Sequence, residues 1–191
     1  MRKIILASRS KARRKLLKQM GLSFVVDGSN AKESHVLRGR CSDLVMGNAL
    51  AKASDIAKRH RSGVVIGADT VVLVGKKIIG KPRDLKDACR TLRLLSKNPQ
   101  WVYTGVAVVD IDNGKVHIDY EKTKVFMYRL SDKQITSYFR KVSPLDKAGS
   151  FDIQGIGGIF IDRIEGCFYN VVGLPIAKLA GMLRAAGVDI F

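Results

Sequence analysis

The sequence has few of the residues that build cross-linked or metal-stapled proteins. Its three cysteines, Cys41, Cys89 and Cys167, are odd in number, far apart and without metal-ligand spacing. This composition excludes a disulfide framework and a cysteine zinc site, and it favours a cytoplasmic, thiol-tolerant location. No apolar run approaches the roughly 18 residues of a membrane span. The run Ile4–Ala7 is too short for a signal peptide, so we expect no membrane association.

Acidic residues are scarce relative to basic ones. The chain has 17 Asp and Glu against 34 Lys and Arg, a formal net charge of +17. This excess favours an anionic partner, either nucleic acid or a polyphosphate small molecule, although a solvated basic surface would have the same composition. Nucleic acid is the less favoured partner. The basic residues are not interleaved with aromatic ones along the sequence, and no helix-turn-helix or RNA-binding motif is present.

The order of the expected elements predicts the fold class. The 191 residues show no repeats or long linkers and suffice for one domain, or one domain with two lobes. Helices are expected at Lys11–Met20, from a Ser42 cap to His60, from an Asp84 cap to Leu95, from Ser131 onward and at Leu174–Ala186. Strands are expected at Arg2–Ala7 and Leu22–Asp27, around turns at Gly75-Lys76 and Asp112-Asn113-Gly114, and as a pair in GIFIDRIEGCFYNVVG. Such mixing, with several antiparallel hairpins, predicts an α/β or α+β fold rather than a simple doubly wound one. We expect an α/β fold with a mixed, largely antiparallel-containing twisted sheet flanked by helices.

Two basic residues lie on the apolar faces of expected helices. With the Ser42–His60 helix wound at about 100° per residue, Lys52 falls in the middle of the apolar stripe. Arg13 likewise falls on the apolar side of the first helix. A lysine in such a place often extends to the edge of the stripe to reach water. The alternative is a cation aimed inward at an anion, because a buried ammonium without a counter-charge is very costly. Two inward cations on separate helices predict one shared anionic object between them.

Carboxylates also stand in unusual places. Asp69 and Thr70 interrupt the apolar run VVIGADTVVLV, and the two-residue period of a strand sends them to opposite faces unless the strand ends or bulges there. A carboxylate in that setting needs a metal, a cation or several donors, although a simple Asp-Thr turn is the alternative. Glu33, in the polar loop GSNAKESH, is a second candidate carboxylate, although most loop glutamates are only solvated.

Two further segments offer polar groups for a ligand. In GKPRD, Pro82 biases Lys81 towards an extended backbone, which holds the lysine side chain clear of the preceding strand. The glycine-rich segment DKAGSFDIQGIGG matches neither a dinucleotide fingerprint nor a P-loop, and an ordinary loop would also account for it. It lets a backbone pass close to a ligand, with Gln154 able to present a donor and an acceptor to a base edge.

Together these residues match the needs of a nucleoside triphosphate. Its roughly four negative charges and bound Mg²⁺ require guanidinium forks, lysines and one or two carboxylates. Arg13, Arg14, Lys52 and Lys81 supply the cations. Asp69 and Glu33 supply the carboxylates, and the helix N-terminus after Ser8–Ser10 adds backbone N–H groups. A polyphosphate at that end also explains why arginines crowd the positive end of a helix dipole.

A series of motifs resembles the Maf family of nucleotide pyrophosphatases over essentially the whole chain. The matching segments, in order, are LASRSKARRKLL, Glu33, NALAKA, GADTVV, GKPRD, TGVAV, DKAGSFDIQG and NVVGLP. The resemblance implies a single domain over 1–191 with two lobes, a cleft and a fold like inosine triphosphate pyrophosphatase. It also implies a cytoplasmic homodimer that hydrolyses a nucleoside triphosphate to the monophosphate and pyrophosphate with a divalent metal, Mg²⁺ or Mn²⁺.

The resemblance assigns roles to individual residues. It matches Ser8, Arg13 and Arg14 to the phosphate-binding loop, Glu33 and Asp69 to the acidic residues, and Lys52 and Lys81 to the two lysines. We expect Glu33 and Asp69 to hold the metal, with Asp69 also the candidate to orient or deprotonate the attacking water. The four cations would neutralise the phosphates and the departing pyrophosphate.

Different motifs of the chain resemble family branches with different base specificities. Thr70 and Gln154 resemble the branch that acts on dTTP and UTP, which suggests substrate-binding roles for both. Lys11 stands where the family usually has Pro, and the extra residue Ala12 resembles the longer loop of the branch that acts on 7-methyl-GTP. A 7-methyl-GTP pyrophosphatase is therefore the alternative enzyme. A nucleic-acid-binding regulator of cell division is the alternative outside enzymes.

Overall fold

The computed structural model describes residues 2–145 and 147–190. The strands are β1 (Ile4–Leu6), β2 (Val25–Val26), β3 (Val64–Val74), β4 (Lys77–Ile79), β5 (Gln100–Asp110), β6 (Val116–Met127) and β7 (Ile161–Glu165). The helices are α1 (Lys11–Gln19), α2 (Cys41–Ala57), α3 (Leu85–Leu95), α4 (Asp132–Phe139), α5 (Phe168–Val172), α6 (Ile176–Ala185) and the 3-10 turns Ala148–Ser150 and Ile156–Phe160. No helix in the described ranges has the length and apolar character that crossing a bilayer requires.

The strands form a mixed sheet in the order β2-β1-β3-β5-β6-β7, with β4 paired to β3. The pairs of β1 with β2 and with β3 are parallel, and Leu6 lies opposite Ile66 in the second pair. The pairs of β3 with β4 and of β6 with β7 are antiparallel. This combination of parallel and antiparallel pairs with helices confirms the predicted α/β class.

The chain divides into two compact units. Unit 1 comprises Met1–Thr70, Tyr103–Glu121 and Tyr169–Phe191, and unit 2 comprises Val71–Val102 and Lys122–Phe168. Glu33, Lys52 and Asp69 therefore belong to unit 1, together with Ser8, Arg13, Arg14 and Thr70. Lys81 and Gln154 belong to unit 2.

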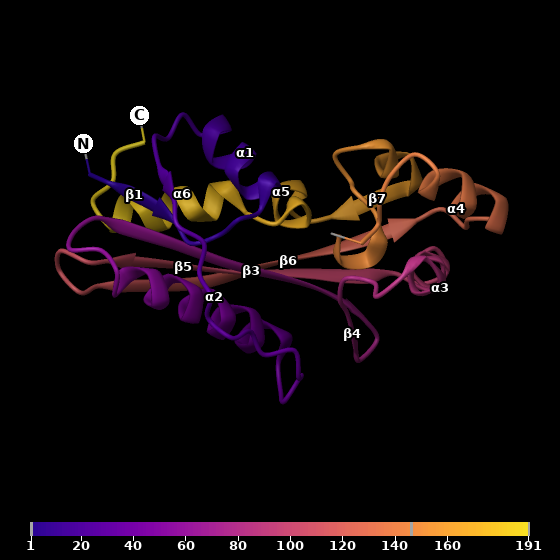
Figure 1. The fold of residues 1–191 in the computed structure, drawn as a ribbon, viewed down its shortest axis with the longest axis horizontal. Coiled ribbons are helices and arrows are strands. Elements are labelled where there is room, and N and C mark those ends of the chain that lie inside the picture. Colours follow the sequence, from indigo (N-terminus) through magenta and orange to yellow (C-terminus); the bar gives the residue numbers. More distant parts are fainter. Residues whose placement is uncertain (1, 146, 191) are drawn as a thin grey trace. The chain divides into compact units, whose positions relative to one another are not determined.

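In unit 1 the sheet is packed on both faces. Figure 1 shows α2 on one side of the strands and α1 and α6 on the other. Because side chains alternate along a strand, Val64, Ile66 and Ala68 of β3 join the core beneath α1 and α6, whereas Val65 joins the core beneath α2. By the same alternation Asp69 faces α2 and Thr70 faces α1 and α6.

Two glycines allow α2 to lie unusually close to the sheet. A Cβ at Gly67 would come within 2.2 Å of the carbonyl oxygen of Ala49, and one at Gly105 within 2.3 Å of the backbone of Val45. Any other residue at either position would push the helix away. The close approach brings the inward side chains of α2 directly onto β3.

In unit 2 the strands have one packed face and one partly exposed face. Gln100, Val102, Thr123 and Val125 are buried, whereas their neighbours on β5 and β6 are partly exposed. The packed interior also contains Leu92 and Leu95 of α3 and Ile135 of α4. Tyr138 meets the Phe160 ring edge-on at a centroid distance of 5.0 Å.

Several local predictions are confirmed by the structure. Asp84 caps α3 by accepting a hydrogen bond from the Asp87 N–H at 2.7 Å, and Ser131 forms a reciprocal capping box with Gln134. Gly75 and Gly114 occupy the two predicted turns with φ of +57° and +70°. The predicted Leu22–Asp27 strand is shorter than expected, because only Val25–Val26 pairs with β1.

Two predictions are wrong. Ser42 does not cap the long helix, which begins one residue earlier and takes Arg40 as an N-cap without a side-chain hydrogen bond; the helix also ends at Ala57 rather than His60. The predicted strand pair contains only β7, because Phe168–Val172 forms α5. The apolar composition of that segment favours a strand. The helix instead buries Asn170, and Gly173 ends it at φ +114° by donating to the carbonyls of Tyr169 and Asn170.

Candidate active site

Lys52 joins the two candidate carboxylates in unit 1. Its side chain lies inward from α2, with 9% of the residue exposed. The ammonium lies 2.7 Å from Oδ1 of Asp69 and 3.0 Å from Oε1 of Glu33. It also donates to the Ala68 carbonyl at 3.4 Å. A buried cation is stable here because two counter-charges and a carbonyl surround it.

Asn48 holds this cluster together, and sequence reasoning missed it. Its amide group donates to Oδ2 of Asp69 and to the carbonyl of Ser34, both at 2.9 Å. Its amide oxygen accepts from the Ser34 N–H at 2.9 Å. Asn48 therefore fixes the loop that carries Glu33 against the strand that carries Asp69. The available signal was its position one turn before Lys52, since residues four apart share a helix face.

The two carboxylates have donor chemistry that suits Mg²⁺ or Mn²⁺. Both offer hard oxygen ligands, and both contact the same Lys52 nitrogen. Glu33 is partly exposed, with 40% of its side chain accessible. The described residues contain no cluster of three or more histidine, cysteine or acidic side chains for a metal. Mg²⁺ typically binds one or two carboxylates and completes its shell with substrate phosphates and water. Glu33 and Asp69 fit that pattern, with the remaining ligands supplied from outside the protein.

Arg13 is held in place by three hydrogen bonds from its guanidinium group. Its Nε donates to the Gly173 carbonyl at 2.9 Å, one terminal nitrogen donates to the Thr70 hydroxyl at 3.0 Å, and the other to the Ser8 hydroxyl at 3.3 Å. A guanidinium has five N–H donors, so two of them make no hydrogen bond within residues 2–145 and 147–190. They provide the geometry for an anion such as phosphate.

A chain of hydrogen-bonded hydroxyl groups, Thr104 and Thr70, holds the Arg13 guanidinium in place. Thr104 is fully buried and donates to the Asn170 carbonyl at 3.1 Å, and its oxygen lies 2.9 Å from that of Thr70. Since the single proton of Thr104 is used on Asn170, Thr70 donates to Thr104 and accepts from Arg13. The segments TGVAV and NVVGLP thus orient the Arg13 guanidinium through hydrogen bonds. Sequence reasoning did not assign them this role.

Arg13 and the carboxylates share one electrostatic environment. Burial lowers the pKa of Arg13, whereas the charges of Asp69 and then Glu33 oppose that shift. Among the described contacts, Arg13 makes no ion pair with either carboxylate. Ser8 is buried and accepts from the Ser10 N–H at 3.3 Å, which places the start of α1 beside Arg13.

The structure does not bring Arg14 into this cluster. Arg14 lines an open groove of about 750 Å³ that contains none of the residues described above. The other lining residues are Lys11, Lys15, Lys18, Leu22, Ser23, Phe24 and Val26. Successive helix residues are rotated by about 100°, so Arg13 and Arg14 address different surfaces. The phosphate-binding role expected for Arg14 stays a prediction.

Lys81 and Gln154 belong to unit 2 and are exposed. Lys81 lines a groove of about 280 Å³ with Asp87 and Arg90 among its neighbours. The Gln154 N–H donates to Oδ1 of Asp152 at 3.0 Å, which leaves the amide side chain outside that turn. Their roles towards a nucleotide stay predictions, and Asp146 of the DKAGSFDIQG segment lies outside the described residues.

Comparisons with known proteins find relatives that match the whole length of the chain. A dTTP/UTP pyrophosphatase of Methanosarcina barkeri is 44% identical over 192 residues, which cover 100% of this chain and 98% of that protein. A dTTP/UTP pyrophosphatase of Bacillus anthracis is 43% identical over 190 residues, with coverage of 100% and 98%.

Fold similarity extends further than sequence similarity. The structure of the Staphylococcus aureus Ham1 protein superposes with a TM-score of 0.54 and 15% identity, covering 96% of this chain and 98% of that one. The family model described as Maf-like protein matches residues 3–186. With that match and relatives above 40% identity over their full length, the chain belongs to the Maf-like protein family.

Proposed function

We propose that this protein hydrolyses dTTP and UTP, together with modified pyrimidine analogues, to the nucleoside monophosphate and pyrophosphate. The relatives that match its full length are named dTTP/UTP pyrophosphatases. The observation that carries the proposal is the convergence of Glu33 and Asp69 on the Lys52 ammonium, in the electrostatic environment of Arg13. Two carboxylates, a lysine and a guanidinium with two open donors suit a metal-bearing triphosphate.

Each group of the cluster has a distinct part in the proposed reaction. Water attacks a phosphorus atom, its oxygen remains on one product, and the bridging P–O bond breaks to release the other. Asp69 accepts the proton of that water or orients it, helped by Lys52 and Asn48, which fix both carboxylate oxygens. Arg13 binds phosphate oxygens through its two open N–H groups. Lys52 balances the charge of the carboxylates before the substrate arrives.

A divalent metal is part of the proposal. Glu33 and Asp69 would hold Mg²⁺ or Mn²⁺, which would neutralise phosphate charge and polarise the phosphoryl oxygens when bound. Lys52 contacts the same carboxylate oxygens. It keeps the two carboxylates close together, where they would act as a pair of metal ligands.

The structure supports a changed role for Thr70 in this proposal. Its hydroxyl proton is used on Thr104 and one of its lone pairs on Arg13. Thr70 therefore orients the phosphate-binding guanidinium and has no proton to donate to a base. Pyrimidine selection then falls to other groups, with Gln154 as the candidate from the family motif. Lys81, the homodimer and the cytoplasmic location also enter the proposal from the family resemblance.

A panel of nucleotides tests the proposal. Pyrophosphate release is measured with dTTP, UTP, 7-methyl-GTP and GTP, each with Mg²⁺, with Mn²⁺ and with a chelator. We expect turnover of dTTP and UTP with either metal and none with the chelator. Preferred turnover of 7-methyl-GTP would assign the enzyme to the alternative substrate. Absence of pyrophosphate release from every nucleotide would overturn the enzymatic proposal.

A further inference from the structure

Two aromatic rings and three cations lie together on the partly exposed sheet face of unit 2. Lys122 and Lys124 of β6 place their ammonium groups 5.4 and 5.6 Å from the centre of the Trp101 ring on β5. Lys124 also lies 5.0 Å from the centre of the Phe126 ring, and the Arg163 guanidinium of β7 lies 3.7 Å from it. We call this set of five residues the Trp101 face.

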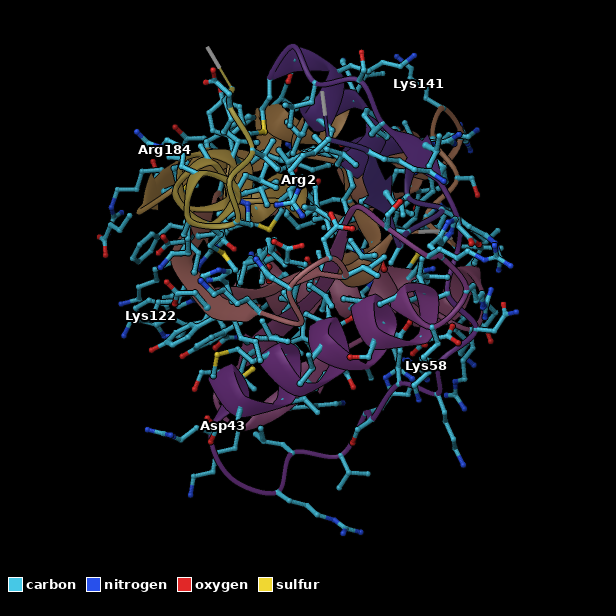
Figure 2. All side chains as sticks on the ribbon, turned by 90° about the vertical axis from the view of Figure 1, so that its left-hand side faces the viewer. Arg2, Asp43, Lys58, Lys122, Lys141 and Arg184 are labelled. Carbon is cyan, nitrogen blue, oxygen red and sulfur yellow. The ribbon has the colours of Figure 1, made fainter. Side chains whose placement is uncertain are left out.

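Strand geometry places all five side chains on one side of the sheet. Lys122, Lys124 and Phe126 alternate along β6 with the buried Thr123 and Val125, and Trp101 lies between the buried Gln100 and Val102. Arg163 is the register partner of Phe126 across the β6–β7 pair. Lys122 is exposed, and its position at the periphery of the molecule is visible in Figure 2. Side chains from the three strands β5, β6 and β7 thus lie on one face of the sheet.

We propose that the Trp101 face binds single-stranded nucleic acid. Bases would stack on Trp101 and Phe126, and phosphates would pair with Lys122, Lys124 and Arg163. Aromatic residues on adjacent strands, bordered by cations, are the arrangement that proteins use to bind unpaired bases. The proposal is independent of the pyrophosphatase activity, because none of these residues belongs to the cluster around Asp69.

The cation–π contacts of the Trp101 face are weak enough to be exchanged. Exposed cation–π contacts contribute little free energy. A base can therefore stack on the ring in place of a lysine, while a phosphate forms an ion pair with the displaced ammonium group. Arg163 pairs with Asp162 at 3.0 Å and with Glu165 at 3.5 Å. The second contact is long, so a phosphate can compete for the guanidinium.

Charge complementarity favours nucleic acid over a second copy of this chain. A two-fold interface would set the same lysines against each other, and the whole chain carries a net charge of +17. Duplex nucleic acid supplies phosphates, but its bases are stacked in the helix and cannot lie on the rings. Rings on which an unpaired base can replace a lysine, bordered by cations, therefore favour a single strand.

The chain offers its own optical reporter for this surface. Trp101 is the single tryptophan, so a change in tryptophan fluorescence reports on this position alone. The probe is a fluorescein-labelled oligothymidylate of about 15 nucleotides, within the range that single-strand-binding modules cover. We expect its anisotropy to rise on titration with the full chain, with parallel quenching of Trp101 by an unlabelled oligothymidylate. A hairpin duplex with the same number of phosphates should bind more weakly and leave Trp101 fluorescence unchanged.

Matched variants separate this surface from general charge attraction. Lys122→Glu/Lys124→Glu and Lys15→Glu/Lys18→Glu change the net charge equally, but the second pair lies on the α1 groove. The first should weaken binding strongly and lower the slope of log K against log salt by about 1.4, since each phosphate contact on a single strand contributes about 0.7. Trp101→Ala should weaken binding about tenfold without changing that slope. Lys124→Gln tests the surface with both rings intact should Trp101→Ala fail to fold.

Three outcomes would overturn the proposal. Equal losses in the two double variants would show non-specific attraction to a basic protein. Equal binding of the duplex and the single strand, with no quenching of Trp101, would show that the rings take no part. The third outcome combines two results: the parent binds no oligonucleotide, and sedimentation shows a dimeric parent but a monomeric Lys122→Glu/Lys124→Glu variant. That combination would assign the surface to self-association. Hydrolysis of dTTP by the same variants should stay at the parent rate, which keeps this test separate from the proposed function.

Discussion

Lys52 and Asp69 form an ion pair of 2.7 Å with 11% and 7% of their side chains exposed. Each residue comes from a different element, and the glycines at 67 and 105 bring those elements together. In such a pair each charge depends on the other, because removing one leaves the second buried without its partner. The pair therefore links the stability of unit 1 to the proposed chemistry.

Asp69→Asn should separate turnover from binding. We expect pyrophosphate release to fall by about 10²–10⁴-fold, the usual contribution of a general base, because an amide cannot accept the proton of the attacking water. Nucleotide affinity, measured calorimetrically with a non-hydrolysable dTTP analogue, should fall far less, since Arg13 still binds phosphate and Glu33 still offers a carboxylate to the metal. Asn48→Ala serves as a comparison that keeps the carboxylate but frees the Glu33 loop. Retention of turnover in Asp69→Asn would show that the base has been misassigned.

Lys52→Met should expose the metal-binding capacity of the two carboxylates. Without the ammonium, Glu33 and Asp69 face each other uncompensated, and we expect the free energy of unfolding to fall by about 3–5 kcal/mol. Mg²⁺ should then raise the melting temperature of this variant more than that of the parent, because the ion replaces the lost positive charge. In Lys52→Met/Glu33→Gln the extra response to Mg²⁺ should disappear. An equal Mg²⁺ response in all three proteins would argue against a metal at these carboxylates.

Thr104→Val should disturb Arg13 through Thr70. The substitution keeps the shape of the side chain but removes the hydroxyl that donates to Asn170 and accepts from Thr70. We expect kcat/KM for dTTP to fall about fivefold to tenfold, since one such hydrogen bond contributes about 1 kcal/mol. Thr104→Ser keeps the hydroxyl and should restore most of the activity. If Thr104→Val and Thr104→Ser lose activity equally, the Thr104 side chain would instead have a packing role.

The sequence predicted those parts of the site that depend on local patterns. The place of Lys52 in an apolar stripe and the interruption of an apolar strand by Asp69 are both visible within one element. The continuous course of β3 also sends Asp69 and Thr70 to opposite faces, as a two-residue period requires. Such signals are local because helix and strand periods are local.

The missed features depend on contacts between distant segments. Thr104 and Gly173 act on Arg13 from positions more than 90 residues away in the chain, and no periodicity records such a pairing. The same holds for α5, where a strand-like composition is overridden by the burial of Asn170. The direction of Arg14 follows from the rotation of α1, which the paired arginines alone do not reveal. The pairing of Trp101 with the lysines of β6, and of Arg163 with Phe126, likewise requires the strand register.

Asp110 should make the free energy of unfolding of unit 1 depend on pH in the acidic range. Hydrogen bonding to Arg2 holds the pKa of the Asp110 carboxyl below its ordinary value. The charged carboxylate therefore stabilises the fold above its unfolded-state pKa of about 3.9, and this stability is lost as the pH falls through the lower folded-state value. Asp110→Asn should lower the free energy of unfolding by about 1.5–3 kcal/mol at neutral pH, as for hydrogen bonds to charged groups.

The same reasoning predicts how the two proteins compare in acid. Denaturant unfolding is followed from neutral pH, through the ordinary aspartate pKa of about 3.9, down to the lower folded-state pKa of Asp110. The stability curves of the parent and Asp110→Asn should converge as the parent carboxyl is protonated. Curves that stay parallel throughout would mean that another group accounts for the loss. Asp112→Asn is the companion variant, because Asp112 also binds Arg2 but is more exposed.

The three thiols should differ in reactivity. Burial raises the pKa of Cys41 to about 11, and only 6% of the residue is exposed, whereas Cys89 and Cys167 are partly exposed. Since the thiolate is the reactive species, iodoacetamide at about pH 8, near the ordinary thiol pKa, should label Cys89 and Cys167 first. Cys41 should react at a comparable rate only after unfolding in denaturant. Peptide mass spectrometry over a time course measures the three rates, and early labelling of Cys41 in the folded chain would mean that the start of α2 opens readily.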